Sequence, residues 1–309
     1  LANNLFWMSR YLERAENNAR LLETYLRRGL SEKYIEVDDW LAILAITGQS
    51  ASYKEKIGGH NQTAIINFIL REKDDPASVL NLVKYARQNA RIVRTTLTRE
   101  TWQAINDFWL YLQKNLNRPA ARNDLPIILA KVREGSSLVR GAIDGTMLRN
   151  DIYRFIRLGV FIERSDNTAR HLSSRYNLFI PSENESVEGY PMLKFEMILD
   201  AVGVMRAYKW LNKGQIERDR VIKFLLNDPT MPRSLIFCYQ DIVRQLTALE
   251  NDYGKTYEAL NIAKKIQSDL AATLKETLVH DDLLDFTRTF IYENAELSEL
   301  VEKEFKFNP

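Results

Sequence analysis

The sequence predicts an all-α protein, a helical bundle built from two tandem similar halves. Its 309 residues include only 12 glycines and 8 prolines, about half of the roughly 12% that average usage would give. Folds rich in β-structure need these residues in their many turns, so the shortage favours long helices. Apolar residues recur at helical spacing along most of the chain, and a motif near its start returns 150 residues later. No alternating pattern typical of a strand competes with these signals.

The returning motif predicts an internal duplication. Residues 11–20 read Tyr-Leu-Glu-Arg-Ala-Glu-Asn-Asn-Ala-Arg, and residues 161–170 read Phe-Ile-Glu-Arg-Ser-Asp-Asn-Thr-Ala-Arg. Later matches keep the same order: Gly48 and Tyr53 with Gly203 and Tyr208, then residues 76–79 with residues 232–235. We therefore expect a first helical half over residues 1–145 and a second half over residues 146–309 that ends in a C-terminal helix. The two halves are expected to pack as one globular unit.

Glycines mark the expected helix ends at the start of the first half. A helix over residues 3–28 would be closed by Gly29, because glycine adopts a positive φ at little cost. The aspartates at 38–39 would cap a helix over residues 40–56. The glycines at 58–59 would stop that helix.

Farther along the first half, Pro76 indicates a helix start, because the missing N–H of proline costs nothing at the first helical position. Apolar residues at helical spacing over 79–97 predict a core-facing stripe. A loop over 117–126 would then lead to a short helix that ends near Gly135. The second half repeats the plan, with a long helix over 147–176, a polar linker over 181–191, helices starting near Pro191, Gly214 and Pro232, and a last helix over 281–307.

The two motif helices each place charged residues opposite an apolar stripe. In the first helix Glu13, Asn17 and Arg20 share that face, and in the second Glu163, Asn167 and Arg170 do so. Ile156 and Val160 lie on the same face of the second helix, which predicts that this face is packed rather than solvated. The candidate site residues are Arg10, Glu13, Arg14, Glu16, Asn17 and Arg20 in the first helix, and Glu163, Arg164, Asp166, Asn167 and Arg170 in the second.

These residues have two interpretations. In one, each carboxylate pairs with an arginine across a helix interface and fixes the packing through bidentate hydrogen bonds. In the other, the carboxylates and guanidinium groups line a pocket for a charged ligand. We favour the structural interpretation, because ionic networks perturb pKa values without catalysing anything. Helical di-iron sites need Glu-x-x-His pairs, which this chain lacks, so we expect no metal and no cofactor.

The charge and cysteine content exclude several classes of protein. The 43 Lys and Arg residues nearly balance the 41 Asp and Glu residues, so the net charge is +2. This near-balance provides no overall field for nucleic acid or an anionic membrane, and we expect neither as a partner. A single cysteine, Cys238, excludes an intramolecular disulfide framework. Without an apolar run of ~20 residues or an opening typical of a signal peptide, we expect a soluble, cytoplasmic protein.

Two further positions have alternative interpretations. Arg233 and Ser234 follow Pro232 at an expected helix start, where free N–H groups and a guanidinium could bind an anion. We slightly prefer a Pro-initiated helix whose first turn is satisfied by the serine. Cys238 lies in an apolar context and His171 lies in a core stripe, so we expect both side chains to be buried and chemically inert.

The opening Ala-Asn-Asn-Leu-Phe-Trp-Met-Ser-Arg-Tyr-Leu-Glu-Arg-Ala-Glu-Asn (residues 2–17) closely resembles the start of the alpha-E family, bacterial all-helical proteins named for an E-R motif. The second Glu163-Arg164 pair and residues 75–78, 86–91 and 224–235 are also similar to that family. The resemblance implies a protein encoded beside, or fused to, circularly permuted ATP-grasp ligases and transglutaminase-like proteins. We therefore expect an accessory or binding component of a peptide- or amide-bond-forming system. The alternative is an enzyme or small-ligand-binding protein that uses the paired Glu-Arg pocket as its site.

Overall fold

The computed structural model describes residues 1–31, 37–177, 190–273 and 280–307, and within these ranges the chain forms α-helices and one 3-10 turn but no strand. The predicted all-α fold class is therefore confirmed. None of the helices in these ranges is long and apolar enough to cross a membrane. The chain divides into two compact units, Leu1–Gly159 and Val160–Pro309, and the internal duplication stays a prediction.

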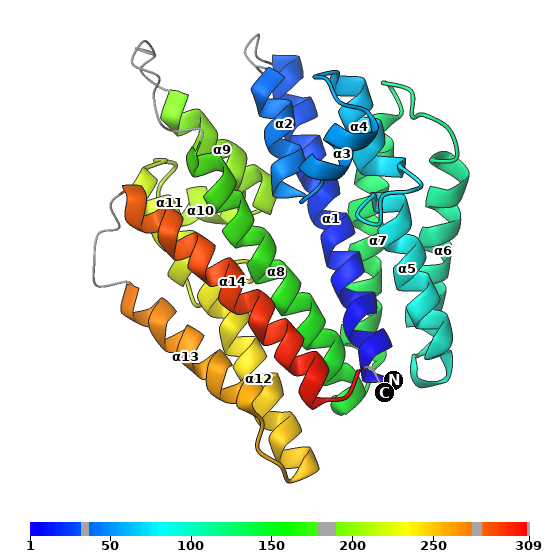
Figure 1. Ribbon diagram of the computed structural model, residues 1–309, viewed down its shortest axis with the longest axis vertical. Helices are drawn as coiled ribbons and strands as arrows, with labels where there is room; N and C mark the ends of the chain where they lie inside the picture. The colour runs from blue at the N-terminus through cyan, green and yellow to red at the C-terminus, as the bar shows by residue number, and fades with distance from the viewer. Residues whose placement is uncertain (32–36, 178–189, 274–279, 308–309) are drawn as a thin grey trace. The chain divides into compact units, whose positions relative to one another are not determined.

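The first unit is organised around α1 (Figure 1). Helix α1 packs against α5 and α7, and α6 packs against the same two helices on their other side, which gives a ring of four helices. The short helices α2, α3 and α4 lie near the C-terminal end of α1. The bounds are α1 Ala2–Ser31, α2 Val37–Ile46, α3 Ser50–Lys56, α4 Gln62–Arg71, α5 Val79–Ile92, α6 Arg99–Asn115 and α7 Leu125–Thr146, followed by the start of α8 Asp151–Asn177.

The second unit begins within α8. In this unit α12 packs against α11 and α13, and α13 packs against α14. The bounds are α9 Tyr190–Val202, α10 Met205–Leu211, α11 Arg218–Asn227, α12 Leu235–Tyr253, α13 Glu258–Ala272 and α14 His280–Glu304. The last of these confirms the single helix expected near the C-terminal end of the chain.

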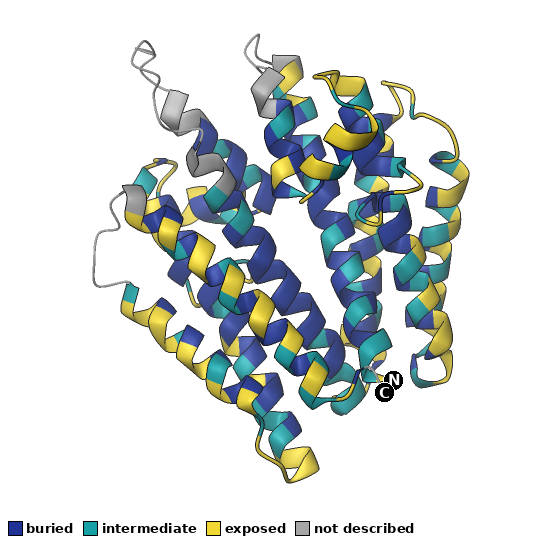
Figure 2. Ribbon diagram, in the orientation of Figure 1, coloured by how far each residue is buried: buried dark blue, intermediate teal, exposed yellow. Residues whose placement is uncertain are grey.

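Buried residues follow the predicted stripes (Figure 2). In α5 and the turn after it, every apolar residue of the 79–97 stripe is buried. Ile156 and Val160 are also buried, so the prediction of a packed face on the second motif helix is confirmed. Cys238 and His171 are buried as expected.

Two helix ends predicted from glycine are wrong. Helix α1 continues through Gly29 to Ser31, and α7 continues through Gly135 to Thr146. A Cβ atom on Gly135 would lie 2.6 Å from ring carbons of Phe108 on α6. This glycine therefore permits close packing of two helices rather than ending one of them.

Two glycines end or break a helix in the first unit. The expected helix over 40–56 is interrupted by Gly48, which has φ +74°. Gly58 adopts φ +65° two residues after the last residue of α3, so the expected stop there is confirmed. Asp38 and Asp39 lie inside α2 rather than capping it.

The expected proline and glycine starts lie in turns before the helices. Pro76 precedes α5, which starts at Val79 and is capped by Ser78, whose hydroxyl accepts from the backbone N–H of Asn81 at 3.4 Å. Gly214 precedes α11, which starts at Arg218. Helix α8 starts at Asp151 rather than 147. Most of the expected linker over 181–191 lies outside the described residues.

Candidate functional site

Two carboxylates of the first motif are buried on α1. The exposed fraction is 2% for Glu13 and 0% for Glu16. Their spacing of three residues places both side chains on one face of the helix. A carboxylate without a compensating partner is costly to bury, so the groups that bind these two residues decide what the site can do.

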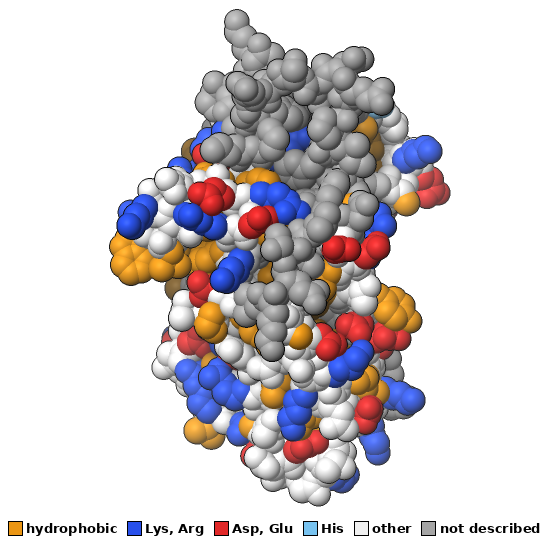
Figure 3. Space-filling model, turned by 90° about the vertical axis from the view of Figure 1, so that its left-hand side faces the viewer, with side chains coloured by type: hydrophobic (Ala, Val, Ile, Leu, Met, Phe, Trp, Pro, Cys, Tyr) orange, Lys and Arg blue, Asp and Glu red, His pale blue; other side chains and the backbone are white. Residues whose placement is uncertain are grey.

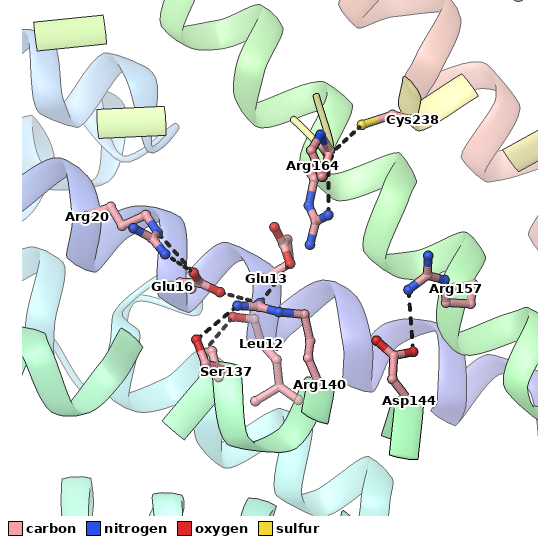
Figure 4. A network of polar contacts seen from close by, with 12 residues as sticks. Leu12, Glu13, Glu16, Arg20, Ser137, Arg140, Asp144, Arg157, Arg164 and Cys238 are labelled. Carbon is pink, nitrogen blue, oxygen red and sulfur yellow. Dashed lines mark hydrogen bonds and ion pairs between the residues drawn. The ribbon is translucent and has the colours of Figure 1, made fainter. Parts of the chain in front are cut away.

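The guanidinium of Arg140 on α7 binds both carboxylates (Figure 4). Its Nη1 donates to Oε2 of Glu16 and, at 3.3 Å, to Oε2 of Glu13. On α1 itself, Arg20 donates from Nε and Nη2 to Oε1 of Glu16 at 2.9 and 2.7 Å. Both oxygens of Glu16 are therefore occupied by guanidinium groups that come from two different helices.

More contacts join α7 to α1 at positions of α7 before Arg140. Arg133 pairs with Glu23 through two short contacts, Nε to Oε2 at 2.8 Å and Nη2 to Oε1 at 3.0 Å. The hydroxyl of Ser136 donates to the carbonyl oxygen of Leu12 at 3.4 Å. The two arginines are seven residues apart and so lie on one face of α7. These contacts form a polar seam between the two helices, defined by Arg133, Ser136 and Arg140.

Sequence reasoning missed this polar seam. The sequence predicts a helix end near Gly135, and this prediction places Arg140 outside that helix. Arg133 and Arg140 are therefore not expected to share a helical face, although both lie on α7. The missed signal is the spacing of residues 133, 136 and 140, which matches one helical face. Nothing in the sequence near Glu16 indicates that its partner lies 124 residues away.

A second polar cluster joins the end of α7 to the start of α8. The hydroxyl of Tyr153 donates to Oδ1 of Asp144 at 2.9 Å. Arg157 Nη1 lies 3.6 Å from the same oxygen. Near this cluster, a Cβ atom on Gly159 would lie 2.3 Å from the carbonyl oxygen of Phe6. The backbones of α8 at Gly159 and α1 at Phe6 therefore lie so close together that only glycine fits at this position.

The second motif has a different set of partners in its own unit. Glu163 is fully buried, and Arg164 and Asp166 are nearly so. Arg170 donates from Nε to Oδ2 of Asp166 at 2.6 Å, one helical turn away. Arg164 donates from Nη1 to the carbonyl oxygen of Pro232 at 3.3 Å, just before α12.

Asn294 on α14 is a buried polar residue of this unit that sequence reasoning missed. Its Nδ2 donates to the carbonyl oxygen of Ile162 at 3.1 Å. Its Oδ1 accepts from the hydroxyls of Ser165 at 3.1 Å and Tyr239 at 2.9 Å. A buried amide therefore joins α8 to α14, where the first unit uses the seam between α1 and α7.

The remaining candidates of the first motif lie around the carboxylates. Arg10 lies over the ring of Trp7 at 4.7 Å and that of Phe6 at 5.5 Å, a cation–π arrangement. Asn17 is buried, as is Asn167 in the second motif, whereas Arg14 is partly exposed.

Ser234 is used by the helix that it precedes. Its hydroxyl accepts from the backbone N–H of Phe237 at 3.2 Å and donates to the carbonyl oxygen of Asp228 at 2.5 Å. The carbonyl oxygen of Arg233 accepts from the hydroxyl of Thr168 at 2.9 Å. The anion site stays a prediction, and Ser234 has the helix-capping role expected in the alternative interpretation of this position.

Burial, together with the nearby charge of Arg233, lowers the pKa of His171 to about 3.

The described residues contain no group of three or more His, Cys, Asp or Glu side chains that could hold a metal ion. The thiol of Cys238 is buried, and its Sγ lies 3.9 Å from the carbonyl oxygen of Pro232. What the site offers is therefore buried carboxylates held by arginines at a helix interface.

A helical chain with two Glu-Arg pairs whose glutamates are buried defines the class of protein. The Alpha-E family, described as a predicted alpha-helical domain with a conserved ER motif, matches residues 1–305, and the chain belongs to that family. Glu13-Arg14 and Glu163-Arg164 are such ER pairs.

Curated relatives are uncharacterized proteins of mycobacteria. One protein of Mycobacterium bovis and one of Mycobacterium tuberculosis are each 23% identical to this chain over 273 residues, and a protein of a second Mycobacterium tuberculosis strain is 22% identical. The match covers 82% of this chain but only 30% of each relative. The chain therefore spans about a third of the length of these relatives. No solved structure matches the chain.

Proposed function

We propose that the chain is a non-catalytic, accessory component of a peptide- or amide-bond-forming system. It would work by binding an ATP-grasp ligase or a transglutaminase-like protein in a bacterial cytoplasm. The observation that carries the proposal is the length of the relatives, of which the matching region is only 30%. A region that is joined to a longer chain in its relatives is expected to work together with another protein part.

The chemistry of the motif residues supports the non-catalytic role. A general acid or base must exchange a proton with a substrate, so one of its atoms has to be accessible. Glu16 is instead fully buried, and both of its oxygens accept from arginines. Such a carboxylate is suited to joining two helices through ion pairs. The mycobacterial relatives support a bacterial origin.

The alternative function has one observation in its favour. The side chains of Arg140 and Arg20 are 27% and 22% exposed, so their guanidinium groups are reachable from solvent. A small anion such as a carboxylate could bind them from outside while Glu16 neutralises them from inside. This ligand would belong to the same amide-forming chemistry, in which carboxylates are substrates.

The test is purification of the tagged chain from its native host, followed by mass spectrometry of the bound proteins. We expect an ATP-grasp or transglutaminase-like protein to be enriched over an unrelated tagged helical protein. The purified pair should form amide bonds faster than the ligase alone, and Arg140→Gln should leave this stimulation intact. Stimulation that disappears in Arg140→Gln, with folding unchanged, would favour the ligand-binding alternative. Neither enrichment nor stimulation would contradict the proposal.

A further inference from the structure

Helix α10 of the second unit presents a tryptophan to solvent. The exposed fraction is 82% for Trp210 and 50% for the adjacent Leu211. The same short helix is anchored through Tyr208, which is fully buried and packs edge-to-face on Phe224 at 5.4 Å between ring centroids. The packing of α10 through Tyr208 therefore does not involve Trp210.

Helix α3 of the first unit shows what this local structure requires. Helices α3 and α10 both follow a glycine with positive φ, +74° at Gly48 and +80° at Gly203. Helix α3 also buries one tyrosine, Tyr53, edge-to-face on Phe68, at 5.2 Å. The two helical elements therefore have the same local architecture.

The two elements differ two and three residues after the buried tyrosine. There α3 carries Glu55 and Lys56, whereas α10 carries Trp210 and Leu211. Because the same architecture forms with charged residues at these positions, packing does not explain the apolar pair. Large exposed apolar side chains next to each other are typical of binding surfaces.

Basic residues outnumber acidic ones in the sequence around the apolar pair. Four exposed side chains of α10, α11 and their connection have no ion-pair partner among the described residues: Arg206, Lys209, Lys213 and Lys223. The two acidic residues of this stretch are already paired, Asp219 with Arg218 at 2.5 Å and Glu217 with Arg220 at 2.9 Å. Figure 3 shows hydrophobic areas with charged side chains of both signs around them on one face of the molecule. We call Trp210, Leu211 and the four basic residues the α10 patch.

We propose that the α10 patch docks an acidic protein surface that has an apolar pocket for the indole of Trp210. An apolar centre with a polar rim is the usual anatomy of a protein interface, and tryptophan is enriched among the residues that contribute most to affinity. The unpaired positive charge selects an acidic partner and speeds encounter with it. This inference rests on the proposed function, because it takes the partner to be the ATP-grasp or transglutaminase-like protein.

A protein fits the patch better than a membrane or a nucleic acid does. Helix α10 has only seven residues, and one tryptophan with one leucine gives little area for insertion into a bilayer. Nucleic-acid surfaces that bind single strands stack successive bases on several aromatic rings, and this stretch exposes only Trp210. The net charge of +2 also adds no long-range attraction to a polyanion.

The experiment measures binding of the full chain to the purified ATP-grasp protein and, separately, to the transglutaminase-like protein of the same host. The variants are Trp210→Ala, Lys209→Glu with Lys213→Glu, and Ile92→Ala as a matched control, because Ile92 is 70% exposed on α5. Thermal melts should show the same melting temperature for all of them. We expect Trp210→Ala to weaken binding by at least about tenfold. The charge reversal should slow association and flatten its salt dependence, and Ile92→Ala should change nothing.

The outcomes separate the inference from the proposed function. If the wild-type chain binds a partner and all variants bind it equally well, the proposed function stands and the inference is wrong. If the wild-type chain binds neither protein, the proposed function is wrong and the docking inference falls with it. Vesicles with anionic lipid and a single-stranded oligonucleotide are tested in parallel. Binding to either that requires Trp210 would reassign the α10 patch and overturn the inference.

Discussion

Arg140 on α7 and Glu16 on α1 are joined by a charge-assisted hydrogen bond across 124 residues of sequence. The same Nη1 atom reaches Glu13, and Arg20 binds the other oxygen of Glu16. A buried carboxylate between two guanidinium groups is weak evidence of net stabilisation, but removal of one member of such a group is costly. Glu13, the glutamate of the first ER pair, therefore takes part in a contact between α1 and α7.

Glu16→Gln should destabilise the protein by about 2–4 kcal/mol, because two guanidinium groups lose their counter-charge. The value lies below that of a fully buried arrangement, since both arginines reach solvent. Urea unfolding at neutral pH measures the change. Glu134→Gln on α7, which breaks an exposed pair with Lys131, is the control and should leave the midpoint unchanged. An unchanged midpoint in Glu16→Gln would mean that the network is held for a ligand rather than for folding.

In the second motif, coupling should follow the observed bond from Arg170 to Asp166. A double-mutant cycle of Asp166→Ala and Arg170→Ala should give an interaction energy of about 1 kcal/mol, reduced by the partial exposure of the arginine. Glu163→Ala and Arg170→Ala should be additive within about 0.5 kcal/mol, because these side chains lie two turns apart on α8. Thermal melts of all variants test both cycles. A larger interaction energy between Glu163 and Arg170 than between Asp166 and Arg170 would show that Arg170 acts on Glu163.

His171 should make folding sensitive to acid. Its pKa is about 3 in the folded protein and near 6.5 in an unfolded chain, so the unfolded chain binds the extra proton between these values. Stability should therefore fall as the pH drops from 6.5 towards 3, by up to ~1.4 kcal/mol per pH unit. His171→Leu should flatten this part of the stability curve relative to the wild type. Exposed His60→Leu is the control, and identical slopes in all three proteins would refute the prediction.

Two glycines of α7 should respond to alanine with opposite signs. Gly135→Ala places a Cβ atom 2.6 Å from the ring of Phe108 and should destabilise the protein by about 1–3 kcal/mol. Gly141→Ala meets nothing within 4 Å and should stabilise it by about 0.5–1 kcal/mol, because alanine restricts the unfolded chain. Denaturant unfolding of the two variants checks the signs. A stabilising Gly135→Ala would mean that α6 and α7 separate easily.

The sequence predicted those parts of the structure that depend on short-range periodicity. Helical spacing of apolar residues identified the stripe over 79–97, and Ile156 and Val160 indicated a packed face on α8. Glycine was harder to interpret: Gly48 breaks a helix with a positive φ, whereas Gly135 lies inside a helix that needs space for a neighbour. Only the packing of α6 distinguishes these two roles.

The partners of the motif carboxylates could not be predicted for a different reason. Arg140 and Asn294 contact their targets across more than a hundred residues. Local patterns contain no information on which distant helix face will meet the motif. The chain offers many exposed arginines, and none is marked in the sequence as the partner of Glu16.

The polar seam also fixes how far α7 can slide along α1. The two helices run antiparallel, with Arg133 paired to Glu23 and Arg140 paired to Glu16. A purely apolar seam could slip by one turn, about 5.4 Å, and still bury carbon against carbon. Here such a slip would break both ion pairs between the helices at once and leave Glu16 with Arg20 as its guanidinium partner in place of two. The polar seam thus favours one axial alignment of α7 and α1 over alignments shifted by a helical turn.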